Sequence, residues 1–233
     1  MEISFTKLRL FLECPLKYKL RLIDGKRSPL PPAASLGISL HRALECFHRK
    51  EAPGPEDLAA CYESRWLASG YPDDSTRDKW FAKGRRILDR YVKRDTDRRS
   101  QIVSVEREFV YPLGRHEVRG MVDRIDRHPD GRIEVIDYKT VGDGEVLEPM
   151  DELQLRFYGL GLRESLAMPA ALLSVDLLAA GRRITVPYDP AGEAGLKSMI
   201  AETADRIEAG AFAPIMSFCP NCEFCETCTR SAA

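Results

Sequence analysis

Long hydrophobic runs are missing from this sequence of 233 residues. No stretch approaches the roughly 20 apolar residues that a membrane-spanning helix needs, and the first residues lack the apolar core and cleavage site of a secretory signal. Charge of one sign is also missing, because 35 Lys and Arg residues nearly balance 36 Asp and Glu residues. These absences predict a cytoplasmic protein that makes no use of a membrane. They also give no sign of a strongly basic nucleic-acid binder, although an acidic metal site can offset a basic groove.

Internal repeats and long low-complexity linkers are missing as well, so nothing in the composition separates domains. A chain of this length, with 44% hydrophobic and 30% charged residues, can bury one sizeable core. We therefore expect a single domain over residues 1–233. It would have a mainly helical part over 1–100, a sheet core over 101–189, and a last helix with a cysteine-rich segment over 190–233.

Apolar periodicity and turn residues predict a definite order of helices and strands. Helices are expected at residues 4–24, 35–50, 56–69, 75–99, 149–166 and 190–209. Strands are expected near residues 102–111, in a hairpin over 117–140, and at 171–178 and 183–188. Ser4 is the expected N-cap of the first helix, and Pro15 should interrupt that helix. This order predicts one α/β domain with a mixed sheet.

Lys and Arg residues gather locally in two places despite the balanced total. One cluster lies between Lys17 and Arg27, and the other lies between Lys83 and Arg99. Each is either a solvated helix face, the usual meaning of such a run, or a surface that contacts phosphate groups. The sequence alone leaves both interpretations open.

Two neighbouring stretches, 118–126 and 133–140, have the pattern of a β-hairpin that carries acidic residues. The His-Pro-Asp-Gly sequence between them is strong turn chemistry. If residues 129–131 form the loop, Asp123 lies directly opposite Asp137, with the two Cβ atoms about 5 Å apart. Two carboxylates at that distance can share a divalent cation.

Lys139 completes this pattern, because side chains alternate along a strand and Lys139 therefore projects from the same face as Asp137. Paired acids that hold a cation beside a lysine are typical of a metal-dependent phosphodiesterase. The alternative is a surface hairpin with solvated charges. The β-rich run that precedes Asp137 counts against this alternative, since an unpaired charge is costly to bury there.

Other polar residues lie in segments that could adjoin the hairpin. His41 is on a predicted helix, where Gly37 permits another backbone to approach closely. Gln154 and Tyr158 are spaced i and i+4 and so share one face of their helix. Each of these has a plain structural interpretation as a helical histidine or a polar helix edge. Glu106 has one too, as a solvent-facing strand residue.

The seven cysteines are concentrated at the end of the chain. Four of them follow one another at intervals of three residues: Cys219, Cys222, Cys225 and Cys228. Packing does not explain such spacing, whereas thiolate ligation does, and the spacing leaves zinc and an iron–sulfur cluster both open. In a reducing compartment clustered cysteines bind metal more often than they form disulfides. Cys46 and Cys61 lie in predicted helices and are expected to be ordinary buried thiols.

Several short motifs follow one another along the chain. They are Ile3-Ser4, Glu13-Cys14-Pro15-Leu16-Lys17-Tyr18, Leu36-Gly37 to His41, Val118-Arg119-Gly120 to Asp126, Ile136-Asp137-Tyr138-Lys139-Thr140, Gln154-Leu155-Arg156-Phe157-Tyr158 and the cysteine tail. In this order they resemble the RecB-type branch of the PD-(D/E)XK nucleases. Within that branch they resemble members with a [4Fe–4S] cluster, such as the AddB nuclease domain and the CRISPR-associated adaptation exonucleases. The resemblance runs almost from end to end.

The resemblance implies a fold and a set of roles. The fold would be a restriction-endonuclease-like core, with a mixed central sheet flanked by helices and the two ends of the chain joined by a metal cluster. The implied ligands of Mg²⁺ or Mn²⁺ are His41, Asp123, Asp137 and the backbone carbonyl of Tyr138. The implied catalytic set is Lys139 as the catalytic lysine, with Asp123, Asp137, Gln154 and Tyr158.

The resemblance also implies that Cys14 joins Cys219, Cys222 and Cys228 as ligands of a [4Fe–4S] cluster. Closing a loop of about 200 residues would strongly restrict the unfolded state. Cys225 is a departure, because the family usually has another residue there. A local four-cysteine site that favours zinc and releases Cys14 is therefore the alternative. The matching Cys-Pro-Leu-Lys-Tyr context of Cys14 favours the family pattern.

The expected activity is metal-dependent hydrolysis of DNA phosphodiester bonds, by an exonuclease on single-stranded or end-containing DNA, in repair, recombination or CRISPR adaptation. The motifs support hydrolysis of a phosphate ester, and the resemblance supplies DNA as the substrate. No helicase motif is present, so a helicase or another repair or adaptation protein is an expected partner. One alternative is a non-catalytic DNA-binding or scaffold protein with a structural cluster. Another is a zinc-stapled module that binds a partner protein.

Overall fold

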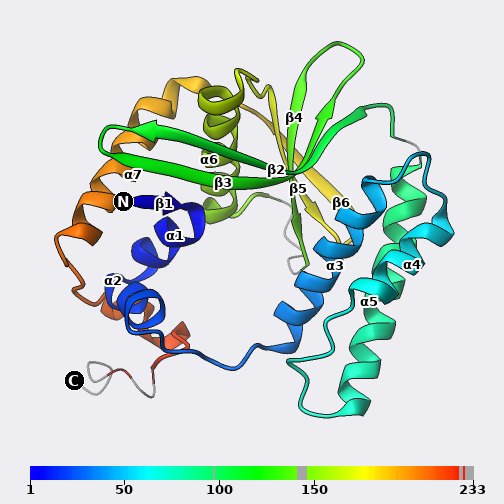
Figure 1. Cartoon of the computed structure of the whole chain (residues 1–233), viewed down its shortest axis with the longest axis horizontal. Helices are drawn as coiled ribbons and strands as arrows, with labels where there is room; N and C mark the ends of the chain where they lie inside the picture. The colour runs from blue at the N-terminus through cyan, green and yellow to red at the C-terminus, as the bar shows by residue number, and fades with distance from the viewer. Residues whose placement is uncertain (97, 141–145, 226–227, 229–233) are drawn as a thin grey trace. The chain divides into compact units, whose positions relative to one another are not determined.

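The computed structural model describes residues 1–96, 98–140, 146–225 and 228 (Figure 1). Its internal contacts divide the chain into two compact units. The first unit comprises residues 1–29, 109–120 and 190–233, and the second unit comprises residues 30–108 and 121–189. None of the helices described is both long and apolar enough to cross a bilayer.

A mixed β-sheet forms the centre of the second unit. Strand β3 (His116–Arg127) pairs antiparallel with β4 (Ile133–Lys139), and β4 pairs parallel with β5 (Leu172–Leu177). Strand β6 (Arg182–Pro187) pairs antiparallel with β5, and β2 (Gln101–Leu113) pairs with β3. Strand β4 is buried at every position before Lys139, as expected of a β-branched run inside a sheet covered on both faces. The predicted mixed α/β architecture is confirmed.

The predicted hairpin loop is confirmed as well. The His128 N–H donates to the Arg132 carbonyl at 2.9 Å, which leaves residues 129–131 as the loop. Gly131 has a φ of 87°, a left-handed conformation that glycine adopts without strain. The pairing runs on to Arg124 opposite Ile136. The next step of this register places Asp123 opposite Asp137.

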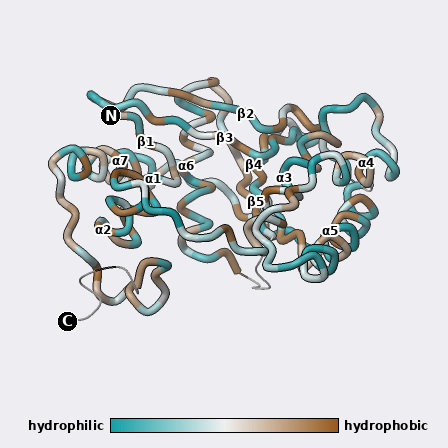
Figure 2. Tube along the Cα trace, turned by 60° about the horizontal axis from the view of Figure 1, so that its bottom comes forward, coloured by the Kyte–Doolittle hydropathy of each residue, from teal (hydrophilic) through white to brown (hydrophobic). Residues whose placement is uncertain are grey.

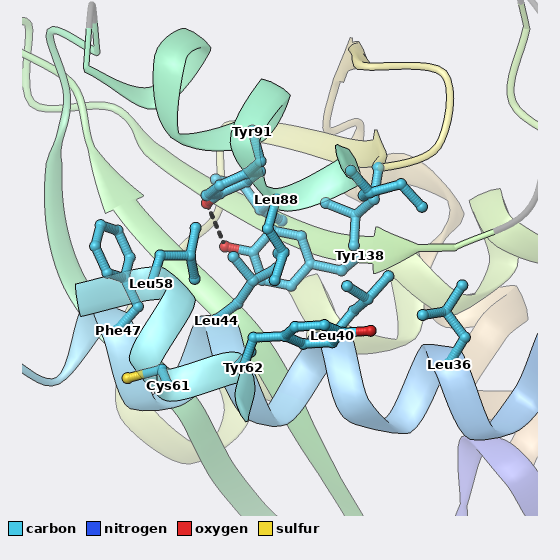
Figure 3. Close-up of a cluster of buried hydrophobic side chains, with 14 residues drawn as sticks. Leu36, Leu40, Leu44, Phe47, Leu58, Cys61, Tyr62, Leu88, Tyr91 and Tyr138 are labelled. Carbon is cyan, nitrogen blue, oxygen red and sulfur yellow. Dashed lines mark hydrogen bonds between the residues drawn. The ribbon is translucent and has the colours of Figure 1, made fainter. Parts of the chain in front are cut away.

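Helices α3 (Pro32–His48), α4 (Pro55–Arg65) and α5 (Asp74–Asp95) form the helical layer on one face of this sheet. Leu36, Leu40 and Leu44 recur at one-turn intervals along α3 and are fully buried. They pack in one cluster with Ile136 and Tyr138 of β4 (Figure 3). This apolar stripe fixes which side of α3 faces the sheet.

Helix α6 (Pro149–Leu166) packs on β4 and β5. Side chains alternate along a strand, so Asp137 points away from the face that carries Ile136 and Tyr138. The Asp137 carboxylate accepts a hydrogen bond from Gln154 of α6. Helix α6 therefore covers the face opposite to the helical layer of α3, α4 and α5.

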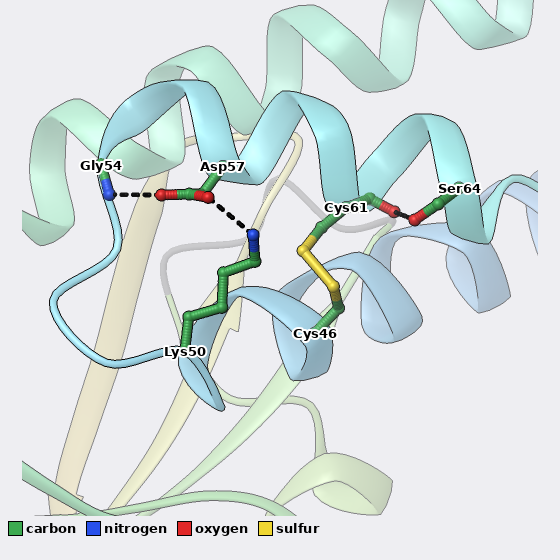
Figure 4. The surroundings of a disulfide bond; sticks show 6 residues. All are labelled: Cys46, Lys50, Gly54, Asp57, Cys61 and Ser64. Carbon is green, nitrogen blue, oxygen red and sulfur yellow. Dashed lines mark hydrogen bonds and ion pairs between the residues drawn. A yellow bond between two sulfur atoms is a disulfide. The ribbon is translucent and has the colours of Figure 1, made fainter.

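Cys46 and Cys61 are not the free thiols that the sequence suggested, because they form a disulfide between α3 and α4 (Figure 4). The two helices pack along each other, and this brings the two Cα atoms to 5.8 Å, a usual separation for a disulfide. Beside it, Asp57 accepts hydrogen bonds from Lys50 at 2.6 Å and from the Gly54 N–H at the start of α4 at 2.8 Å. The start and the middle of α4 are thus both fastened to the end of α3.

The first unit begins with β1 (Glu2–Ser4), which pairs parallel with residues 117–119 of β3. Helix α1 (Phe5–Glu13) follows, and Ser4 caps it as predicted, because its Oγ accepts the Lys7 N–H at 3.4 Å. Helix α2 (Pro15–Tyr18) then starts at a proline, where no N–H is needed, and continues into a π-helical turn, η1 (Lys19–Ile23). The predicted break at Pro15 is confirmed.

The rest of the first unit comes from the end of the chain. Helix α7 (Glu193–Glu208) follows a 3₁₀ turn, η2 (Pro190–Gly192), and packs on α1 and β1. A second 3₁₀ turn, η3 (Met216–Asn221), leads into the cysteine tail. Beginning and end of the chain thus share one small core, in which the ring of Phe212 stacks on that of Tyr18.

A buried ionic network joins β3 to α5. Arg124 is fully buried and donates to both oxygens of Asp126 at 2.7 Å each, and to Asp95 at 2.8 Å. It also donates to the hydroxyl of Tyr91 at 2.8 Å, and this hydroxyl lies 3.0 Å from that of Tyr138. The network therefore reaches from β3 through α5 to β4.

Replacement of Arg124 tests this network. Arg124→Met leaves the buried Asp126 without its close cation and removes one of the two cations beside Asp95, so we expect the free energy of unfolding to fall by about 3–5 kcal/mol. Urea unfolding followed by circular dichroism measures the change. Arg127 is exposed on the same strand, and Arg127→Met, the matched control, should stay within about 0.5 kcal/mol of the unaltered protein. Equal stability of the two variants would show that the network does not hold the hairpin.

Candidate functional site

Asp123 and His41 meet beside the hairpin. The Asp123 carboxylate accepts the backbone N–H of Tyr138 at 2.8 Å, so a side chain of β3 takes the place of a backbone partner for β4. His41 of α3 approaches from the helical layer, with Nδ1 3.4 Å from Asp123 Oδ2 and Nε2 2.9 Å from the carbonyl oxygen of Tyr138. Three of the groups predicted as metal ligands are thus brought together: His41, the Asp123 carboxylate and the Tyr138 carbonyl.

The close approach predicted at Gly37 is present. A Cβ atom at this position would lie 3.1 Å from Oγ1 of Thr140, just after β4. A larger side chain would therefore push α3 away from the end of β4. Because Gly37 precedes His41 by about one helical turn, the small residue helps to hold His41 near the hairpin.

Glu106 was named in the sequence analysis as a solvent-facing strand residue and was not grouped with the expected metal ligands. It lies on β2, but it is not a freely solvated strand residue, because His41, Glu106 and Asp123 each offer one ligand atom within 4.8 Å of the others. These three residues are called the triad below. Glu106 has a backbone φ of 46°, a left-handed conformation that is costly for a residue other than glycine. This conformation interrupts the regular alternation of side chains along β2. The triad lines an open groove of about 440 Å³, together with Gly37 and Glu45.

The second half of the site lies between β4 and α6. Lys139 Nζ donates to Gln154 Oε1 at 2.6 Å and lies 2.9 Å from Asp137 Oδ2. Gln154 Nε2 in turn donates to Asp137 Oδ1 at 3.0 Å and to the Tyr158 hydroxyl at 2.7 Å. All four predicted residues are therefore joined in one hydrogen-bonded group.

Asp151 adds a further contact that the sequence analysis did not predict. Its Oδ1 lies 3.3 Å from Lys139 Nζ, so the lysine lies between two carboxylates. Asp151 precedes Gln154 by three residues on α6 and therefore shares its face. That spacing was visible in the sequence and could have identified Asp151.

Burial and neighbouring charges raise the pKa values of two acids of the site. Burial, and then the charge of Asp123, raise the pKa of Asp137 to about 6 and that of Glu106 to about 7. Burial alone would lower the pKa of His41, but its hydrogen bond to Asp123 and the surrounding acids raise it to about 9. Burial alone would also lower the pKa of Lys139, but the charges of Asp137 and Asp151 outweigh the effect of burial and raise this pKa. The lysine is therefore a cation at neutral pH.

A divalent cation fits these donors. Asp137 Oδ2 is buried, and its close partner is Lys139 Nζ at 2.9 Å. Carboxylate oxygens are the ligands that Mg²⁺ and Mn²⁺ prefer, and imidazole is a common further ligand of transition metals. Asp137 was grouped with His41 and Asp123 in the sequence analysis. In the structure, Glu106 is the acid that lies within the triad. Asp137 would be a fourth ligand, through the carboxylate that pairs with Lys139 and accepts from Gln154.

The cysteines form a separate site in the first unit. Cys14, buried between α1 and α2, lines one apolar cavity together with the tail cysteines Cys219, Cys222, Cys225 and Cys228. The tail is held there in part by the Ile215 N–H, which donates to Cys14 Sγ at 3.4 Å. Five thiols around one cavity match the donor chemistry of a thiolate-bound zinc or iron–sulfur cluster. The distant Cys14 is thus brought to the tail, and Cys225 also lines the cavity.

Comparisons with known proteins agree on the family and the fold. The family model of the PD-(D/E)XK nuclease superfamily matches residues 2–229. Over 154 residues the chain is 28% identical to one of the subunits of the ATP-dependent helicase/deoxyribonuclease of Streptococcus equi subsp. zooepidemicus, a match that covers 60% of this chain and 14% of that relative. Its fold resembles the crystal structure of a candidate exonuclease from Eubacterium rectale, with a TM-score of 0.62 and 14% identity over 99% of this chain and 87% of that one.

The triad predicts a measurable cation affinity. Glu106→Gln should weaken Mn²⁺ binding at least about tenfold, the loss that even outer partners of metal ligands can cause. Isothermal titration calorimetry measures this without a reaction. Glu45 lines the same groove outside the triad, so Glu45→Gln is the matched control and should bind Mn²⁺ like the unaltered protein. Equal Mn²⁺ affinity in the two variants would remove Glu106 from the site.

Proposed function

Because this chain belongs to the PD-(D/E)XK nuclease superfamily, we propose that it hydrolyses phosphodiester bonds in DNA with Mg²⁺ or Mn²⁺. The observation that carries this proposal is the hydrogen-bonded group of Lys139, Gln154 and Asp137 beside the triad. It combines oxygen donors for a cation with a fixed positive charge, the two things that phosphate-ester hydrolysis needs.

The reaction joins a water oxygen to phosphorus and breaks the bond from phosphorus to one ester oxygen. The triad and Asp137 would hold the cation, which supplies Lewis acidity that polarises the phosphate and helps to ionise water. The open groove beside the triad gives a DNA strand access to these residues.

Lys139 acts on the phosphate by its charge. Its raised pKa keeps it protonated at neutral pH, so it stabilises negative charge that develops on the phosphate oxygens and is a poor base for water. Gln154 fixes the position of Lys139 through its carbonyl oxygen and that of Asp137 through its amide N–H. Tyr158 in turn accepts from the same amide group and holds its orientation.

We further propose that the enzyme is an exonuclease that acts on single-stranded or end-containing DNA in repair, recombination or CRISPR adaptation, beside a helicase or another protein of these pathways. The relative from Streptococcus equi subsp. zooepidemicus, whose name combines helicase and deoxyribonuclease, supports such a partnership. The match covers only 14% of that relative, so its activities and partners are carried to this chain only as a proposal.

A [4Fe–4S] cluster in the first unit is the cofactor that we propose for the cysteines. Cys14, Cys219, Cys222 and Cys228 would hold it, because Cys14 lies at the same cavity as the tail. Such a cluster would fasten α1 and α2 to the end of the chain. Zinc is the alternative occupant, and Cys225 is the alternative fourth ligand.

The nuclease proposal predicts the loss of DNA cleavage in two variants. Asp123→Ala removes an oxygen donor of the triad, and Lys139→Ala removes the charge beside the phosphate, so each should lower the rate at least about a hundredfold. Cleavage of end-labelled and circular DNA with Mn²⁺ measures the rate and the need for ends. Arg132→Ala, an exposed cation of the same hairpin, should cleave normally. DNA binding without cleavage by the unaltered protein would indicate the non-catalytic scaffold instead.

The cluster proposal predicts different behaviour for two cysteine variants. After anaerobic purification the protein should be brown and contain iron, Cys14→Ser should lose most of the iron, and Cys225→Ser should retain it. Metal analysis and the visible spectrum measure this. A colourless protein with stoichiometric zinc, or iron loss in Cys225→Ser but not in Cys14→Ser, would contradict the proposed ligand set.

A further inference from the structure

The two clusters of basic residues, which the sequence could not separate, have different surroundings in the structure. In the first unit, Lys17, Lys19 and Arg21 are each paired with an acid: Glu13, Asp24 and Glu223. These cations are occupied in holding their own unit together. The second cluster lies on α5 and is only partly neutralised.

One side of α5 carries a line of five exposed cations. They are Lys79, Lys83, Arg86, Arg90 and Lys93. They recur at alternating intervals of four and three residues, which places them along one side of the helix, and they span about 21 Å at 1.5 Å per residue. The buried side of the same helix is formed by Gly84, Ile87, Leu88 and Tyr91. Hydrophilic and hydrophobic stretches accordingly alternate along α5 (Figure 2).

These five side chains, called the basic stripe below, differ from the other cations of α5. Arg77 pairs with Asp74 and Asp78, Arg85 pairs with Glu63, and Arg94 pairs with the buried Asp176. Within the described part of the chain, no member of the basic stripe makes an ion pair. Lys83 lies over the ring of Trp80, and Arg90 donates to the carbonyl oxygen of Ala179 at 2.8 Å. The stripe therefore keeps positive charge that no ion pair within the described residues neutralises.

The basic stripe also runs past the end of the catalytic strand. Lys83, Arg86 and Arg90 line an open groove of about 370 Å³ with Asp89 and Ala179. Ala179 follows Leu178, whose N–H donates to the carbonyl oxygen of Lys139 at 2.9 Å. The groove is thus joined through two hydrogen bonds and one peptide bond to the backbone of Lys139.

We propose that the basic stripe binds the phosphate backbone of the DNA substrate away from the bond that is cut. Regularly spaced, solvated cations along a rigid helix complement a chain of phosphates, and they contact it without reading its sequence. This inference rests on the proposed function for its substrate. It adds a surface outside the groove of the triad, and it assigns the affinity for DNA to α5 and the chemistry to the hairpin.

Two paired variants test the proposal in the intact chain. Lys83→Gln with Arg86→Gln removes two charges from the basic stripe, and Arg77→Gln with Arg85→Gln removes two charges from the same helix outside it. Glutamine keeps helix propensity close to that of lysine and arginine, and none of the four positions belongs to the buried side of α5. Circular dichroism should be the same for both. Binding of a fluorescent single-stranded oligonucleotide is measured by anisotropy in chelator, where no cleavage occurs, at several salt concentrations.

For the stripe variant, the slope of log affinity against log salt should become shallower by about 1.4, since each lost phosphate contact removes about 0.7. The control variant should keep the slope of the unaltered protein. In cleavage assays the stripe variant should show a raised KM with an unchanged kcat. Equal slopes in the stripe variant and the unaltered protein, or an equal loss in both paired variants, would overturn the proposal.

Two further outcomes are distinguishable. Polyglutamate is the probe for an acidic protein segment; if the stripe variant loses polyglutamate binding but keeps its DNA slope, the stripe serves a protein partner and the proposal fails. The unaltered protein and the stripe variant could differ in slope as predicted although the unaltered protein never cleaves DNA. In that case the proposed nuclease function fails and the assignment of the stripe stands.

Discussion

The pairing of β3 with β4 is the constraint on which the rest of the second unit depends. Its register makes every residue of the hairpin face one of two layers. Asp137 and Lys139 face α6, whereas Arg124 and Tyr138 face the helical layer of α3 and α5. The polar site and the buried ionic anchor are therefore alternate residues of the same two strands. A slip of one residue in the pairing would turn the site residues toward the helical layer and the ionic anchor toward α6. Arg124 would then lose its carboxylate partners.

Local chemistry explains why the hairpin and its site were predictable. A turn sequence fixes the loop, the loop fixes the register, and the register places Asp123, Asp137 and Lys139 without knowledge of anything distant. The i, i+4 spacing of Gln154 and Tyr158 is equally local. Glu106 was not predictable in this way, because its place in the triad depends on a left-handed backbone conformation that regular strand alternation does not contain.

The disulfide and the difference between the two basic clusters were missed for one physical cause, which is that both depend on how separate helices pack. The disulfide between Cys46 and Cys61 needs α4 to turn back along α3, and nothing in the spacing of two cysteines reports that. The basic clusters looked alike in sequence for the same reason. Whether a lysine or arginine on a helix is neutralised depends on the acid opposite it, as with Arg94 and the buried Asp176. Sequence therefore predicted most of the elements and the local grouping of the hairpin residues, but not β1 and not which charges remain without an ion pair.

The crowded charges of the site link its stability to its proposed cation. Glu106 and Asp137 have raised pKa values of about 7 and about 6, and that of His41 is about 9. Groups whose pKa is higher in the folded chain stabilise it fully below their unfolded values, near about 4 for the acids and about 6.5 for histidine. That stabilisation is lost as the pH rises through the folded values.

At neutral pH Asp137 is therefore mostly deprotonated and Glu106 is about half deprotonated, while His41 still carries its proton. A divalent cation would supply positive charge to the carboxylates at the pH where they most lack it, and ligation would displace the proton from His41. Binding would thus return stability that the deprotonated site has lost. The raised pKa values of the two acids and the proposed affinity for a cation would have the same origin, the burial of carboxyl groups close to Asp123.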